Sequence, residues 1–251
     1  MGYQEMNIYQ VDKLLVLNSD NGPDSILYNG HPYYRYMDRL YIPKEPSELD
    51  PSEVSQLSEL RLRFAGEIID YDYSLNVMQR IYELASLNKR GNIIDFGCGG
   101  GIIIDGVISG RINPIPLSIT ALDISEFAVF YAKKAFLDNH KNQAVNMIQE
   151  FNCRVFNENE KLNLDSDSVD AIISSFVMHF KVYENQMSEL YRVLKPGGKF
   201  IYNDYIYSRY MGHTKKTLTL LNKVGFQTET HVEQFTHHGV IKHQLFVTAK
   251  K

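Results

Sequence analysis

A cluster of glycines near residue 97 is the strongest candidate for ligand-binding chemistry in this chain. It reads Asp95-Phe96-Gly97-Cys98-Gly99-Gly100-Gly101, directly after a short apolar run. Glycines at such a point allow a tight turn and let a ligand approach the backbone. The spacing is D-x-G-x-G-x-G. The dinucleotide pattern G-x-G-x-x-G fails because Ile102 and Ile104 stand where its last glycine is required.

The charge at the loop entrance indicates which kind of ligand fits. A dinucleotide places its pyrophosphate on a helix N-terminus, where negative charge is favoured. The carboxylate of Asp95 suits a positively charged group instead, such as the sulfonium or amino group of S-adenosylmethionine. The alternative is a plain turn with a helix-capping Asp. Four glycines in five positions are a costly way to make such a turn.

A second carboxylate, Asp123, ends the apolar run 118–123. An acidic residue at the end of a second strand accepts hydrogen bonds from ribose hydroxyls. The alternative is that Asp123 caps the following helix, a role for which Ser125 competes. The glycine loop at the right distance upstream favours the ribose role.

Strand-like and helix-like segments alternate after residue 91. We expect strands at 92–96, 118–123, 153–156, 169–175, 199–204 and 244–248. We expect helices at 102–109 and 126–139, around 187–194, and up to 223. This alternation predicts an α/β domain over 91–251, with a mostly parallel sheet covered by helices on both faces. Such sheets bind ligands at the carboxyl ends of their strands, which is where Asp95 and Asp123 lie.

Residues 1–90 are polar and rich in tyrosine. Asp50-Pro51-Ser52-Glu53 predicts a helix start, with apolar residues at helical spacing up to Phe64, and Ser74 predicts another. We therefore predict a helical and loop extension that acts as a substrate lid. Its candidate substrate contacts are Tyr33, Tyr34 and Arg35, of which Arg35 suits a carboxylate or phosphate. The alternative is that the tyrosines only cover the domain.

The amino-acid composition limits which binding partners and which location are expected. The 251 residues carry a net charge of −4 and contain no long basic run, so nucleic acid is not the expected partner. Two cysteines predict a reducing compartment, and we found no signal peptide and no apolar run of membrane-spanning length. The expected location is the cytoplasm, and the oligomeric state stays open.

Residues 92–250 resemble the class I S-adenosylmethionine-dependent methyltransferases. The segments that carry the resemblance are IIDFGCGGG, ALDISEFAVFYAKKA, LNLDSDSVDAIISSFVMHF, ELYRVLKPGGKFIYND and LLNKVGF, in the order and spacing of that family. The resemblance implies a doubly wound, mostly parallel seven-stranded sheet. It also implies S-adenosylmethionine as the cofactor and S-adenosylhomocysteine as the product.

The resemblance assigns roles to residues. The loop residues Gly97, Cys98, Gly99 and Gly101, with Asp95 nearby, are implied to bind the methionine part of the donor. Asp123 would bind the ribose, Ile124 the adenine ring, and Asn157 or Glu158 the adenine amine. Ser174, Ser175 and Phe176 would border the methyl group, and 195–198 would form a distant turn. The candidate catalytic residues are His179 and Asp204; His213, His31 and the pair His237-His238 are further candidates for a base.

Methyl transfer from a sulfonium needs mainly alignment and exclusion of water, and a base only where the acceptor must lose a proton. We predict methyl transfer to an O or N atom of a small organic molecule, with no metal. An RNA or peptide acceptor, and transfer of a modified group such as carboxymethyl, stay open. A nicotinamide-dependent oxidoreductase is disfavoured by the glycine spacing. A non-catalytic binding module is disfavoured by the intact loop and Asp123.

Overall fold

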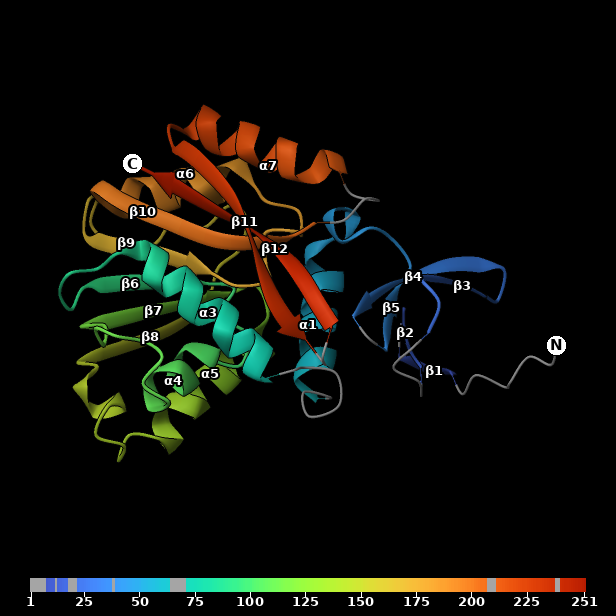
Figure 1. The fold of residues 1–251 in the computed structure, drawn as a ribbon, viewed down its shortest axis with the longest axis horizontal. Coiled ribbons are helices and arrows are strands. Elements are labelled where there is room, and N and C mark those ends of the chain that lie inside the picture. The colour runs from blue at the N-terminus through green and yellow to red at the C-terminus, as the bar shows by residue number, and fades with distance from the viewer. Residues whose placement is uncertain are drawn as a thin grey trace.

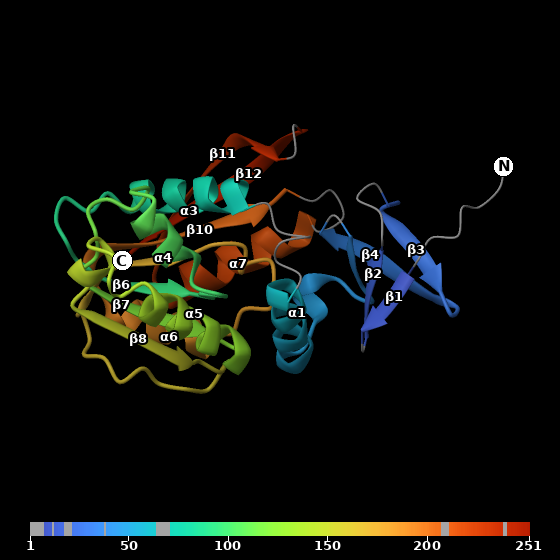
Figure 2. The ribbon, with the colours of Figure 1, turned by 90° about the horizontal axis from the view of Figure 1, so that it is seen from below.

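The chain folds around two β-sheets with a helix between them (Figures 1 and 2). The computed structural model describes residues 8–11, 13–17, 22–37, 39–63, 71–206, 211–237 and 240–251. The larger sheet holds seven strands, all from residue 92 onward, and the smaller sheet holds five strands, all before residue 43. None of the helices in the described ranges is long and apolar enough to cross a membrane.

The larger sheet has the strand order β11-β12-β10-β9-β6-β7-β8. Its strands are β6 (Asn92–Phe96), β7 (Ser118–Asp123), β8 (Glu150–Val155), β9 (Val169–Ser174), β10 (Leu194–Tyr205), β11 (Gln227–His237) and β12 (Val240–Lys250). The pairings from β10 across to β8 are parallel, and β12 pairs antiparallel with both β10 and β11. The six strands expected from the sequence are present, and β11 is additional.

Helices cover both faces of this sheet. α3 (Tyr71–Ala85), α4 (Ile102–Ile108) and α5 (Glu126–Asp138) lie on one face, and α6 (Glu184–Val193) and α7 (Met211–Val224) lie on the other. Neighbouring residues of one strand serve opposite faces: Ile93 packs in the cluster of α3 and α4, and Ile94 in that of α6 and α7. Burial on both faces explains why these strands are apolar throughout.

The expectation of a helical N-terminal extension is wrong for residues 8–42. These residues form an antiparallel sheet of order β1-β2-β5-β4-β3, made of β1 (Ile8–Val11), β2 (Leu14–Leu17), β3 (Ser25–Tyr28), β4 (His31–Met37) and β5 (Leu40–Ile42). The turn at Asn29-Gly30 is the physical reason. Both residues have positive φ, 50° and 79°, and they join β3 to β4 as a two-residue hairpin loop.

One face of the small sheet packs against α1 (Pro51–Arg63). Leu14, Leu40 and Leu57 are fully or almost fully buried in this shared cluster. α1 begins at the predicted capping box: Asp50 Oδ1 accepts the N–H of Glu53 at 2.9 Å, and Glu53 Oε2 accepts the N–H of Asp50 at 3.0 Å. Phe64, which the periodicity places on this helix, lies outside the described residues.

Glu53 ties α1 to the small sheet by charge as well. Its buried carboxylate accepts hydrogen bonds from Lys44, at 2.8 and 2.9 Å, and from Lys13, at 3.3 Å. These hydrogen bonds hold the pKa of Glu53 below its usual value, against the opposing and larger single effect of burial. The small sheet and α1 therefore form one packed unit.

The predicted turn at 195–198 is an irregularity within β10 rather than a separate loop. The register of β10 with β9 shifts between Leu194 and Lys199, and Gly197 has a φ of 78°. Gly197 and Gly198 thus lie within β10, and the chain does not leave the sheet at this point.

Candidate functional site

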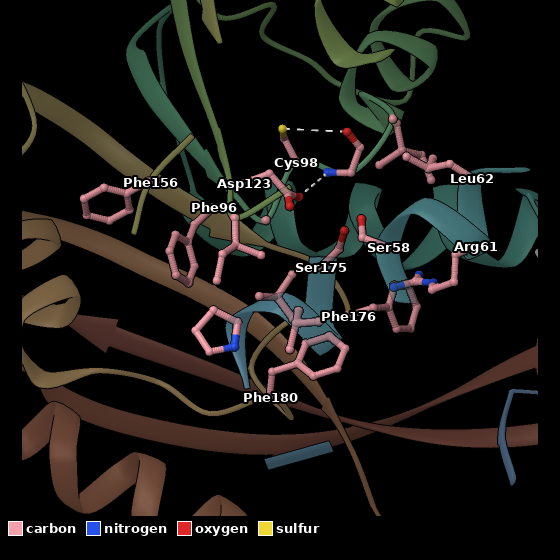
Figure 3. A pocket seen from close by; sticks show the side chains of 18 of the residues that line it. Ser58, Arg61, Leu62, Phe96, Cys98, Asp123, Phe156, Ser175, Phe176 and Phe180 are labelled. Atoms are coloured by element: carbon pink, nitrogen blue, oxygen red, sulfur yellow. Dashed lines mark hydrogen bonds between the residues drawn. The ribbon is translucent and has the colours of Figure 1, made fainter. Parts of the chain in front are cut away.

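A pocket lies at the carboxyl ends of β6, β7 and β9, under α1 (Figure 3). The space at this site amounts to about 1260 Å³, with the open solvent at its mouth included. Its lining comes from the segment 49–62, from α3, from the glycine loop and from the residues that follow β7, β8 and β9. The residues that line the pocket include Leu49, Val54, Ser58, Arg61, Leu62, Tyr71, Ser74, Phe96, Gly97, Cys98, Gly99, Gly100, Asp123, Ile124, Phe156, Ser175, Phe176, Val177, Phe180, Lys181, Tyr183 and Gln186.

The glycine loop lines the pocket in a backbone conformation that requires glycine. Gly97, Gly99 and Gly101 have φ values of 76°, 51° and 88°. A Cβ on Gly97 would lie 2.1 Å from Cγ2 of Val177, so no side chain fits there. Gly101 does not line the pocket; its Cα would place a Cβ 3.0 Å from the backbone of Ala132, so this glycine permits close packing of α5.

Asp123 links the end of β7 to this loop. Its Oδ2 accepts the N–H of Gly99 at 2.9 Å, and its Oδ1 accepts the N–H of Ser125 at 3.0 Å. Burial raises the pKa of the Asp123 carboxyl, and these hydrogen bonds together with the nearby Arg61 act in the opposite direction. Ser125 is the N-cap of α5, since its hydroxyl accepts the N–H of Ala128, so Asp123 is left to face the pocket.

Asp95 lies beneath the glycine loop and is not a lining residue. It is fully buried, and neither of its carboxylate oxygens has a hydrogen-bond partner. Burial, and secondly the charge of Asp123, raise its pKa to about 7. The structure therefore does not bring the carboxyl of Asp95 to the position of direct ligand contact that the sequence suggested.

Phe96 and Phe156 lie at one end of the pocket (Figure 3), and Ile124, the residue expected to contact the adenine ring, is also a lining residue. Asn157 and Glu158 are not lining residues; the Asn157 amide donates to Glu160 Oε1 at 2.8 Å. Sequence reasoning missed Phe156 and Gln186. Gln186 reaches this end from α6, and its Nε2 donates to the carbonyl of Phe156 at 3.1 Å. The signal that could have identified Phe156 is its position as an apolar residue directly after β8.

The segment after β9 forms the middle of the wall. Ser175 and Phe176, which were expected to border the methyl group, line the pocket, whereas Ser174 is fully buried outside it. Phe176 has a φ of 57°, which is strained for a residue with a side chain. Its N–H donates to Asn203 Oδ1 at 2.8 Å, so Asn203 holds this backbone in place.

A buried chain of hydrogen bonds extends from Asn203. Its amide donates to Gln244 Oε1 at 2.8 Å, and the Gln244 amide donates to the Tyr73 hydroxyl at 2.5 Å. The Tyr73 ring in turn contacts the Phe176 ring, with centroids 5.8 Å apart. This network joins β10, β12 and α3 behind the pocket wall, and no sequence motif indicated it.

The predicted catalytic residues do not line the pocket. His179 is buried, and its Nε2 lies 2.5 Å from the Tyr36 hydroxyl of β4. Burial, and secondly the charge of Arg61, hold its pKa well below the usual value. His179 therefore fastens the small sheet to the pocket wall, next to the lining ring of Phe180 at 4.2 Å between centroids.

Asp204 is also buried away from the pocket, where its Oδ2 accepts the Thr214 hydroxyl at 3.1 Å. Of the other candidate bases, His213 lies 2.6 Å from the carbonyl of Met178, and His31 is exposed on β4. The side chain of His237 and all of His238 lie outside the described residues. Among the lining residues that the structure describes there is no histidine.

The structure does not bring the tyrosine-rich sheet to the pocket. Tyr33 is buried on the face of the small sheet that points away from α1, and Tyr34 does not line the pocket. Arg35 donates to Asp24 Oδ1 at 2.6 Å and to the carbonyl of Gly22 at 3.1 Å. The covering element is α1, whose Ser58, Arg61 and Leu62 sequence reasoning missed.

These features fit S-adenosylmethionine. Gly97 to Gly100 offer an open backbone cradle, Asp123 offers a buried carboxylate for hydroxyls, and Ile124 and Phe156 offer apolar surface for a purine. No group of three or more His, Cys, Asp or Glu side chains in the described ranges is placed to hold a metal.

The fold and the glycine loop resemble those of Rossmann-like methyltransferases. Residues 94–202 match the methyltransferase domain family. An uncharacterized methyltransferase of Schizosaccharomyces pombe is 27% identical over 199 residues, covering 75% of this chain and 72% of the relative. A malonyl-[acyl-carrier protein] O-methyltransferase of Marinomonas is 29% identical, covering 61% of this chain and 54% of the relative.

Solved structures agree on the fold. An S-adenosylmethionine-dependent methyltransferase from Aquifex aeolicus superposes with a TM-score of 0.50 at 21% identity, covering 80% of this chain and 98% of the other. A [4+2]-cyclase superposes with a TM-score of 0.56 at 16% identity, covering 82% and 98%. Residues 94–202 are thus similar to a methyltransferase domain, and the larger sheet has the fold of S-adenosylmethionine-dependent methyltransferases. The acceptor of this chain has to be inferred from its own pocket, because one fold serves different reactions.

Proposed function

We propose that this protein transfers a methyl group from S-adenosylmethionine to an O or N atom of a small organic molecule. The pocket is the observation that supports this most directly. The glycine loop and Asp123 open into the same space as an apolar wall from α1 and from the segment after β9. A space roofed by a helix suits a small acceptor better than an extended chain of a macromolecule.

Gly97 to Gly100 and Asp123 would hold the donor, with Ile124 and Phe156 on its purine. The bound donor supplies a methyl group that is already activated on a sulfonium. The residues of this chain then have to orient the acceptor and exclude water. Leu49, Val54, Phe176 and Phe180 form the apolar surface for both tasks.

Proton removal is not built into the described lining. Burial raises the pKa of Tyr71 and of Tyr183, so both hydroxyls stay protonated near neutral pH. The described lining contains no histidine. The pocket therefore suits an acceptor whose attacking atom is nucleophilic without first losing a proton to a base. His179 would act as a positioning residue, through Phe180.

The relatives do not decide the acceptor. The names of the matched proteins include a malonyl-carrier methyltransferase and, from Staphylococcus haemolyticus, a ribosomal protein L11 methyltransferase. The alignments cover 54% and 40% of these two proteins. A cytoplasmic location also stays a prediction.

The test is to incubate the protein with methyl-labelled donor and a cell extract that has been separated by filtration into small molecules and macromolecules. Label should appear in the small-molecule fraction, and the wild-type protein should transfer more label than the Asp123→Ala variant. Label found only in protein or RNA would contradict the small-molecule proposal while leaving methyl transfer intact.

A further inference from the structure

Two cations from different segments of the chain line the pocket. Arg61 comes from α1, and Lys181 comes from the segment after β9. In Figure 3, Arg61 lies beside Ser58 at the end of the pocket opposite Phe156, with Ser175 and Phe176 between them. Among the described lining residues, Asp123 is the only carboxylate.

The guanidinium of Arg61 lacks an ion pair of the kind that other helical arginines in this chain have. On the same helix, Arg63 pairs with Glu59 at 2.5 Å, and on α6 Arg192 pairs with Glu189 at 2.5 Å. Arg61 makes no ion pair with any residue in the described part of the chain, and its buried Nε has no hydrogen-bond partner. A buried donor without an acceptor destabilises the folded protein, and a ligand oxygen that reaches this nitrogen would supply the missing acceptor.

Lys181 is exposed at the pocket, with its ammonium 5.0 Å from the centre of the Tyr183 ring. Its recorded contact is with that aromatic face, and no carboxylate of the described chain pairs with it. Lys181 is therefore placed to attract an anion without first breaking an ion pair.

The donor alone does not balance these charges. S-adenosylmethionine carries a sulfonium, an ammonium and a single carboxylate. With it bound, four positive groups would face two carboxylates, its own and that of Asp123. Even if one cation contacts the carboxylate of the donor, positive charge remains at the acceptor end, and a second anion would reduce it.

We propose that the acceptor is a small acid whose carboxylate binds at Arg61 and Lys181. The planar guanidinium fits a carboxylate with two parallel hydrogen bonds. The body of the acid would lie on Phe176, Phe180 and Leu49, which are apolar lining residues. This inference rests on the proposed function and names the substrate class for the same pocket.

The experiment compares acids with their uncharged amides. The probes are benzoate and benzamide, hexanoate and hexanamide, and indole-3-acetate and its amide. Each is titrated by calorimetry into the protein saturated with S-adenosylhomocysteine. At least one acid should bind about tenfold or more tightly than its amide, which corresponds to about 1.4 kcal/mol.

Variants assign that preference to the two cations. Arg61→Gln and Lys181→Gln should each reduce the preference for the acid about tenfold, with amide binding unchanged. Arg61→Lys should retain part of it, because the charge stays. Arg63→Gln is the matched control on the same helix, outside the pocket, and should bind like wild type. Thermal unfolding of each variant checks that it is folded.

The outcomes separate the two proposals. If S-adenosylhomocysteine itself does not bind, the proposed function fails. If it binds but no acid binds more tightly than its amide, the acid-acceptor inference is overturned. It is also overturned if Arg61→Gln and Lys181→Gln weaken only S-adenosylhomocysteine, because the cations then serve the carboxylate of the donor.

Discussion

The carboxylate of Asp123 accepts the backbone N–H of Gly99 at 2.9 Å. This bond joins the end of β7 to the loop that follows β6. A carboxylate and a glycine loop that are 24 residues apart in sequence thus form one rigid edge of the pocket. The same carboxylate faces the pocket, so a ligand that binds there meets a preformed contact rather than a loose side chain.

A cradle of this kind makes Gly99 sensitive to substitution through ligand binding. Gly99→Ala places a methyl group in open space at a φ of 51°, and the strain should cost about 1–2 kcal/mol of stability. Gly110→Ala is the matched control, with open space and a φ of 74° outside the pocket. We expect similar losses in urea unfolding but weaker S-adenosylhomocysteine binding for Gly99→Ala alone. Equal affinities of the two variants would contradict a cradle at Gly99.

The buried carboxyl of Asp95 should make stability fall as pH rises. Its pKa is about 7 in the folded protein and near 3.8 when unfolded, so between these values the folded state holds a proton that the unfolded state has lost. Stability should therefore decrease by up to about 1.4 kcal/mol per pH unit through this window and then level off above pH 7.

Urea unfolding at several pH values checks this effect. Asp95→Asn removes the titration, so its stability relative to wild type should increase from pH 5 to pH 7. The exposed Asp138→Asn should follow wild type throughout. Parallel curves for wild type and Asp95→Asn would show that the carboxyl does not titrate in this range.

His179 should act in the opposite direction. Burial holds its pKa well below 6.5, so the folded state keeps the ring neutral while the unfolded state takes up a proton below that pH. The stability from the neutral ring is complete above pH 6.5 and is lost as the pH falls. Wild type should lose stability from pH 7 to pH 5 that His179→Gln does not lose, in thermal unfolding. A steeper loss in the variant would contradict this placement of His179.

Asn203 should matter for both stability and the pocket. Asn203→Ala leaves the N–H of Phe176 and the amide oxygen of Gln244 without their partners, which should cost about 1–3 kcal/mol. Because Phe176 lines the pocket at a strained φ, acceptor binding should weaken as well. Asn222→Ala, an exposed amide bonded to Thr228, is the control and should change stability little. Urea unfolding measures the free energy of unfolding of both variants. An equal loss in Asn203→Ala and Asn222→Ala would exclude this role for Asn203.

The sequence was sufficient for the features that depend on local spacing. The capping box at Asp50 forms as expected, and Gly97, Gly99, Asp123 and Ile124 line one pocket, whereas Asp95 and Gly101 do not. The small sheet was missed because its strands are short and tyrosine-rich. They are recognised as strands only through their pairing, such as that of β3 with β4 around Asn29-Gly30.

Contacts between segments that are far apart in the chain could not be predicted from the sequence. Arg61 reads as an ordinary polar position of an amphipathic helix, and only the placement of α1 over the pocket leaves its Nε buried without a partner. Tyr36 and His179 are 143 residues apart, and Asn203 and Gln244 are 41 apart. Long-range pairs of this kind leave no periodic pattern in the chain.

Calorimetric titration of S-adenosylhomocysteine tests the central claim, which is that the glycine loop and Asp123 bind the donor. We expect saturable one-to-one binding to wild type, weakened at least about tenfold in Asp123→Ala and less in Asp123→Asn, which keeps one acceptor oxygen. The exposed Asp138→Ala should bind like wild type. Absence of binding to the wild-type protein, or equal affinity in folded Asp123→Ala, would contradict the assignment of this pocket to the donor.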